Sequence, residues 1–147
     1  MKGTISLLLV LILLFFHAPS YSTTGPGVRA LYAGTISSND TDGAYLGSGL
    51  YLLNFIIGLE IQKIENESIG NVNIGAFKRL NNNHLIKYKF GYGSENAVSI
   101  IEYEYSQYRV YSNEAKGKNN FNITIGYQEY HSQDPFSGLR VSLGYTF

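Results

Sequence analysis

The chain ends in a segment whose side chains alternate without a break between large apolar residues and small or polar ones. In an extended strand successive side chains point to opposite faces, so residues 138–147 form two faces of different character. The apolar face comprises Leu139, Val141, Leu143, Tyr145 and Phe147, and the other face comprises Gly138, Arg140, Ser142, Gly144 and Thr146. This period of two predicts a β-strand with one face toward an apolar environment and the other toward a polar one.

Seven earlier segments show this pattern, although the first of them supports either facing, and turn-forming residues separate them. We expect these strands at residues 28–36, 45–53, 55–64, 69–80, 86–93, 97–111 and 121–130. The 13 Tyr, 8 Phe and 16 Gly, against only 3 Pro, also favour β-structure. The segment lengths match the roughly 9–11 tilted residues that cross a bilayer, and an even number of strands permits closure. The sequence therefore predicts an all-β fold, a closed eight-stranded antiparallel up-and-down transmembrane β-barrel.

The polar faces of several segments carry charged residues, which would line the interior of such a barrel. These residues are Glu60, Arg79, Lys87, Lys89, Glu102, Glu104 and Arg140. Because an unpaired buried charge is costly, we expect them to form an interior ion-pair network that fills the barrel. An ion or proton pathway is the alternative, although eight strands enclose a space only just wide enough for side chains.

Residues 1–22 have the pattern of a secretory signal peptide. Lys2 supplies a positive start, residues 5–16 form an apolar core, and Ser20 and Ser22 are small residues before the expected cleavage point. The apolar run is shorter than the roughly 17–25 residues of a spanning helix. We therefore expect a signal peptide at 1–22 and one barrel domain at 23–147.

The charge balance and the absence of Cys exclude several kinds of function. With 11 basic and 11 acidic residues the formal net charge is zero, so no attraction to nucleic acid is expected. A chain without Cys has no disulfide framework, no thiolate metal site and no cysteine nucleophile. We expect no metal and no cofactor.

The aromatic residues at the last and third-last positions resemble the closing strand of bacterial outer-membrane β-barrels, which the assembly machinery reads as an insertion signal. Here that signal would comprise Leu143, Tyr145 and Phe147. With its signal peptide and eight alternating segments, the chain resembles the small eight-stranded barrels of the OmpX, NspA and OmpA transmembrane-domain type. The resemblance implies a monomer in the bacterial outer membrane, with a structural or surface-interaction role and no open pore. Its partners would be outer-membrane lipid and lipopolysaccharide, and the outer-membrane assembly machinery during insertion.

The same resemblance places the C-terminus on the periplasmic side. The outward connections then carry acidic residues and no Lys or Arg, namely Asp40, Asp42, Glu65, Glu67, Glu95 and Asp134. They would either meet divalent cations that bridge lipopolysaccharide or be plain solvated turns. The periplasmic side carries Lys116 and Lys118, with Lys78 and Arg79 nearby, and its connection at 112–120 is long for this side. Adhesive members of this group of small barrels carry long outward loops. The outward connections here are short, which argues against an adhesive role.

Two other functions stay open. Alternation does not reveal which face is inside, so a secreted lipocalin-like barrel with a hydrophobic ligand would show the same pattern. A lipid A-modifying outer-membrane hydrolase is the second alternative, and lipid A deacylase barrels use a His and a Ser two positions apart on one strand. Here His131 and Ser132 are adjacent and would face opposite sides, and His84 is expected in a periplasmic turn. We therefore assign no catalytic residue and expect no enzyme activity.

Overall fold

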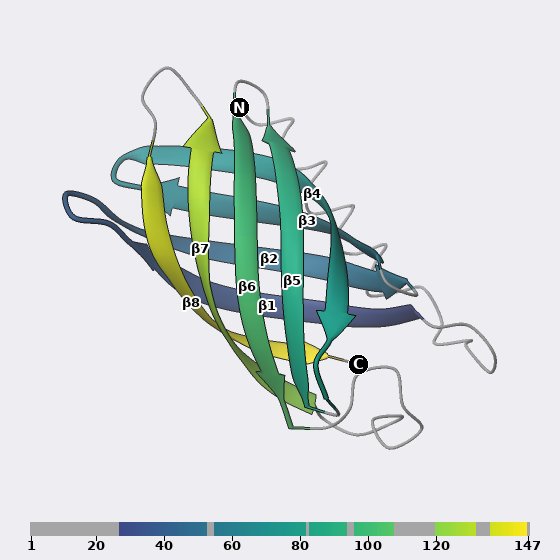
Figure 1. Ribbon diagram of the computed structural model, residues 1–147. Helices are drawn as coiled ribbons and strands as arrows, with labels where there is room; N and C mark the ends of the chain where they lie inside the picture. Colours follow the sequence, from purple (N-terminus) through teal and green to yellow (C-terminus); the bar gives the residue numbers. More distant parts are fainter. Residues whose placement is uncertain are drawn as a thin grey trace.

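The structure is a computed structural model that describes residues 27–52, 55–81, 83–93, 96–107, 120–131 and 136–146. These residues form eight antiparallel strands that close into one barrel in the order of the sequence (Figure 1). The strands are β1 (Gly27–Ser37), β2 (Asp42–Leu52), β3 (Phe55–Ile64), β4 (Glu67–Arg79), β5 (His84–Gly93), β6 (Ala97–Ser106), β7 (Asn120–His131) and β8 (Ser137–Thr146). The described residues contain no helix that is long and apolar enough to cross a membrane. The predicted all-β, eight-stranded closed antiparallel barrel is confirmed.

Closure depends on the pairing of the first and last strands. β1 and β8 pair from Ala30 opposite Thr146 to Ser37 opposite Leu139. Each strand therefore has a hydrogen-bonded neighbour on both sides, and the sheet has no free edge.

The two ends of the barrel carry different parts of the chain. The connections β1–β2, β3–β4, β5–β6 and β7–β8 lie at one end. This is the acidic end, because its described residues include the exposed Asp40, Asp42, Glu65 and Glu67. The opposite end is the terminal end, where β1 begins and β8 finishes.

At the acidic end, β2 and β4 begin earlier than the predicted segments. Asp42 and Glu67 were predicted in loops, but they begin β2 and β4. Asp42 pairs with Ser37, and Glu67 pairs with Ile64. Strand pairing uses backbone hydrogen bonds, which a polar residue forms as well as an apolar one does. The β3–β4 connection is thereby reduced to two residues, and Glu65 within it has a positive φ of 52°, as tight hairpin turns require.

Other predicted features lie wholly or partly outside the described residues. β6 ends at Ser106, short of the predicted 97–111, and residues 108–119, with most of the expected long connection, are not described. The same holds for the expected signal peptide at 1–22, for residues 53–54 between β2 and β3 and for Phe147.

The barrel exterior is apolar and its interior is polar. On β5, Tyr88 and Tyr92 are 54% and 70% exposed, whereas the side chain of Lys89 is buried. Exposed large apolar side chains occur in this way on every strand from β2 to β8. β1, whose sequence fits either facing, turns Ala30 and Ile36 inward. This arrangement is the reverse of a water-soluble barrel.

The interior is layered along the barrel axis. An apolar cluster at the terminal end contains Ala30, Tyr51, Ile56, Phe77 and Leu85. A second cluster at the acidic end contains Val98, Ile100 and Tyr130, with Ile64, Ile69 and Phe136 packed against it. On β3, Glu60 lies between Ile56 of the first cluster and Ile64 of the second. Charged side chains therefore occupy the middle of the barrel, with apolar side chains toward both ends.

Close packing of the interior makes one glycine of β2 sensitive to substitution. The Tyr32 ring lies over Gly47, where an added methyl group would overlap it, whereas a methyl group on Gly49 would make ordinary 3.8 Å contacts. We expect Gly47→Ala to lower the free energy of unfolding by about 1–3 kcal/mol through overpacking. Gly49→Ala, on the same face of β2, should leave it nearly unchanged. Urea unfolding followed by circular dichroism measures both variants, and equal midpoints would contradict this packing.

Candidate functional site

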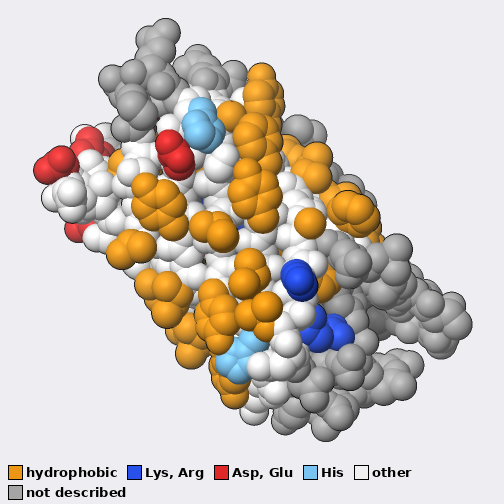
Figure 2. All heavy atoms as spheres, in the orientation of Figure 1, with side chains coloured by type: hydrophobic (Ala, Val, Ile, Leu, Met, Phe, Trp, Pro, Cys, Tyr) orange, Lys and Arg blue, Asp and Glu red, His pale blue; other side chains and the backbone are white. Residues whose placement is uncertain are grey.

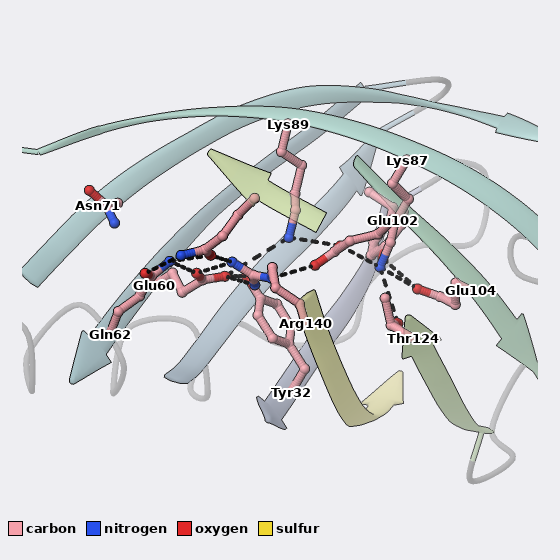
Figure 3. A network of polar contacts seen from close by, with 12 residues as sticks. Tyr32, Glu60, Gln62, Asn71, Lys87, Lys89, Glu102, Glu104, Thr124 and Arg140 are labelled. Carbon is pink, nitrogen blue, oxygen red and sulfur yellow. Dashed lines mark hydrogen bonds and ion pairs between the residues drawn. The ribbon is translucent and has the colours of Figure 1, made fainter. Parts of the chain in front are cut away.

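Charged side chains from strands that are not neighbours meet inside the barrel (Figure 3). Arg140 of β8 donates to Glu60 of β3 through both terminal nitrogens, and the Nη1–Oε1 and Nη2–Oε2 distances are both 2.8 Å. Two parallel charge-assisted hydrogen bonds fix orientation as well as distance. The Nε atom of Arg140 lies 3.2 Å from Oε1 of Glu102 on β6, so one guanidinium joins two carboxylates across the lumen.

Two lysines of β5 complete this ion-pair network. The Nζ atom of Lys87 lies 2.7 Å from Oε2 of Glu104 and 3.2 Å from Oε2 of Glu102. The Nζ atom of Lys89 lies 3.0 Å from Oε2 of Glu102 and 3.9 Å from Oε2 of Glu60. Glu102 therefore contacts all three cations of the network. Three carboxylates balance three cations, and each of the six charges has an opposite charge within 4.0 Å.

Tyrosines support the network from β1 and β2. The hydroxyl of Tyr51 donates to Glu104 and that of Tyr32 donates to Glu60, each at 3.1 Å. The ring of Tyr45 packs against the guanidinium of Arg140, whose Cζ atom lies 3.8 Å from the ring centre. Such contacts supply hydrogen bonds and cation–π attraction where water is excluded.

Neutral polar side chains continue the network toward the acidic end. Oε1 of Gln128 accepts a hydrogen bond from Nη1 of Arg140 at 2.6 Å, and Nε2 of Gln128 donates to Gln62 at 3.2 Å. The hydroxyl of Tyr130, part of the apolar cluster at this end, donates to Gln62 at 2.9 Å. The charged centre is thus joined to the apolar layer through side chains that carry no charge.

The space beside the ion-pair network is small. A cavity of about 10 Å³ lies beside the network, lined by residues that include Lys87, Lys89, Glu102 and Thr124. This volume is at the lower limit for one water molecule. The cavity is therefore too small for an organic ligand.

Six of the seven charged residues predicted in the interior meet in this network. Arg79, the seventh, takes no part in the ion pairs described above. It is half-buried at the last position of β4, near the terminal end. The alternation of the sequence predicts the face on which a side chain lies but not its height in the barrel.

The surface charges are divided between the two ends, with the apolar exterior between them (Figure 2). The predicted acidic residues Asp40 and Glu65 lie in connections at the acidic end, beside the strand residues Asp42 and Glu67. Lys63, near the end of β3, is also exposed there. The predicted Glu95, Asp134, Lys116 and Lys118 lie outside the described residues.

The predicted insertion signal lies on the barrel exterior where it is described. Leu143 is 68% exposed. The ring of Tyr145 packs edge-on against Phe121 of the neighbouring strand, with 5.4 Å between ring centres. Phe147 lies outside the described residues.

Both histidines of the described barrel lie on strands and contact a neighbouring strand. His84 was expected in a turn, but it is the first residue of β5, and its Nδ1 contacts the hydroxyl of Tyr103. His131 is the last residue of β7, and its Nε2 lies 2.9 Å from the Oγ of Ser99 on β6. The sequence reasoning missed the second contact because it considered only Ser132. A signal was present, since Ser99 and His131 each interrupt the apolar face of their own strand.

Comparison with known proteins gives one structural relative. The chain matches a solved structure described as "De novo design of transmembrane beta-barrels", with a TM-score of 0.57 and 10% sequence identity. The match covers 85% of this chain and 98% of the designed one, so the two share the barrel fold. No protein-family model matches the chain, and no curated protein matches its sequence.

The central position of Glu102 gives a test of the network. Glu102→Gln removes the carboxylate shared by Lys87, Lys89 and Arg140, so we expect the free energy of unfolding to fall by about 3–5 kcal/mol. Glu67→Gln, at an exposed position of the acidic end, is the matched control and should change it by less than about 0.5 kcal/mol. Urea unfolding monitored by circular dichroism gives both values. If the two variants unfold at the same urea concentration, the ion pairs do not stabilise the barrel.

Proposed function

We propose that this chain is an integral protein of the bacterial outer membrane, a small barrel of the OmpX, NspA and OmpA transmembrane-domain type. One observation carries the proposal: the exterior is apolar from β2 to β8, while six paired charges are buried inside. In water this exterior would be an apolar patch far larger than soluble monomers expose. In a bilayer it is buried, and a closed sheet leaves no backbone group of its strands unpaired in lipid.

The dimensions of the strands support this location. They have 10 to 13 residues, and about 9–11 tilted residues are enough to cross the hydrocarbon layer. Exposed tyrosines occur near both ends, with Tyr92 toward the acidic end and Tyr103 and Tyr105 toward the terminal end. Aromatic residues in these positions suit the two interfaces between lipid and water.

The paired charges inside the barrel favour a structural or surface-interaction role without conduction. A secreted lipocalin-like barrel needs an apolar lining and room for its ligand. This interior is instead lined by charges, and the cavity beside them measures about 10 Å³. The proposed role needs no cofactor and no metal.

The two ends suggest which partners the barrel meets. With the C-terminus in the periplasm, the acidic end faces outward, where carboxylates such as Asp40 and Glu65 meet lipopolysaccharide and the divalent cations that bridge it. The described outward connections are short, so they present a small surface. The exterior residues Leu143 and Tyr145, followed by Phe147, supply the signal for the outer-membrane assembly machinery.

Fractionation of native membranes tests the proposal. The protein should sediment with the outer membrane, and the unboiled protein should migrate differently from the boiled one on a dodecyl sulfate gel, because a closed barrel resists the detergent until heated. Recovery as a soluble periplasmic or secreted protein would disprove a membrane location. Recovery with the inner membrane would disprove only the outer-membrane assignment.

A further inference from the structure

A serine and a histidine form a hydrogen-bonded pair on the apolar exterior of the barrel. The Oγ atom of Ser99 on β6 lies 2.9 Å from the Nε2 atom of His131 on β7. β6 and β7 are paired neighbours (Figure 1). In their ladder His131 lies opposite Ala97, two residues from Ser99. A histidine nitrogen within hydrogen-bond distance of a serine hydroxyl is the arrangement that activates serine as a nucleophile.

The pair lies where the apolar exterior meets the acidic end. Ser99 is the third residue of β6 and is half-buried, and the next residue on its face, Ile101, is 51% exposed. Phe90, opposite Ser99 on β5, is 46% exposed. An acyl chain that lies along this part of the exterior would therefore bring its carbonyl end close to Ser99.

A carboxylate lies on the same patch. Glu129 is opposite Ser99 in the β6–β7 ladder and two residues before His131, on the same face of β7. Residues two apart on a strand are separated by about 6.6–6.8 Å, a distance that the side chains of Glu and His can span together. Glu129 is thus within reach of the imidazole, and a rotation of its side chain would let it stabilise the imidazole when it is protonated.

We propose that Ser99 and His131 hydrolyse an ester-linked acyl chain of a membrane lipid held against β6 and β7 at the acidic end. Ser99 is the nucleophile and His131 the general base and acid. The inference rests on the proposed membrane location, which brings lipid esters to the level of this pair.

The reaction balances with water as the only co-reactant. Oγ of Ser99 attacks the ester carbonyl carbon while its proton passes to Nε2 of His131. The C–O bond to the lipid alcohol then breaks, and His131 returns the proton to the leaving oxygen. Water, deprotonated by His131, attacks the acyl-serine, and the fatty acid leaves as Ser99 recovers its proton.

The experiment uses the full chain folded in lipid, with folding of each variant checked by the heat-dependent gel shift. Vesicles of glycerophospholipid and vesicles containing lipopolysaccharide are supplied separately, and released fatty acid is measured by mass spectrometry. We expect release from at least one vesicle type, its loss in Ser99→Ala, and a decrease of about 100-fold or more in His131→Ala. The vesicle type that yields the fatty acid identifies the lipid.

Matched controls separate catalysis from folding. Ser48→Ala changes another half-buried serine on the barrel exterior, and His84→Ala changes the histidine at the terminal end, so both should retain full release. A fluorophosphonate probe on the unmutated chain should label Ser99 by peptide mapping, which needs no variant to fold. A barrel that shows the gel shift but releases no fatty acid and takes no label on Ser99 overturns this inference while leaving the membrane location standing.

Discussion

The pairing of buried charges is the constraint on which the rest of this barrel depends. Glu60, Glu102 and Arg140 come from three strands of which no two are neighbours, so their contacts tie opposite sides of the barrel together. A slip of one residue in any of these strands would turn its charge to the apolar exterior and leave its partners unpaired. The network therefore holds strand register as well as filling the lumen.

Other features of the interior follow from this requirement. The apolar clusters toward the two ends limit the access of water, which strengthens the hydrogen bonds between them. Small residues make room for the large side chains of the network, as Gly47 does for the Tyr32 ring and Gly126 does for Glu102. The space around the network in the described barrel is thus taken up by groups that hold the fold together.

The functions proposed for this barrel lie at its exterior and at its two ends. The carboxylates of the acidic end and the tyrosines near both ends suit contacts with head groups and lipid, as proposed above. The pair of Ser99 and His131 differs from them because it places two reactive groups in direct contact where the apolar exterior ends. A barrel with a fixed interior is a suitable support for such a pair, since the β6–β7 ladder sets the distance between the two residues.

The sequence by itself determined the eight strands and the two faces of each, because period-two alternation follows directly from an extended backbone. It also grouped the interior charges on one face, but it did not give the height of each charge in the barrel, because alternation carries no information about height. Only the tertiary structure decided that the apolar face is outside, since alternation is the same for both facings. The contact between Ser99 and His131, which lie 32 residues apart along the chain, was also decided by the tertiary structure. A contact between two strands depends on the register in which the strands pair, and the sequence of each strand alone does not give that register. Register and facing are properties of the closed sheet, which forms only when β1 meets β8.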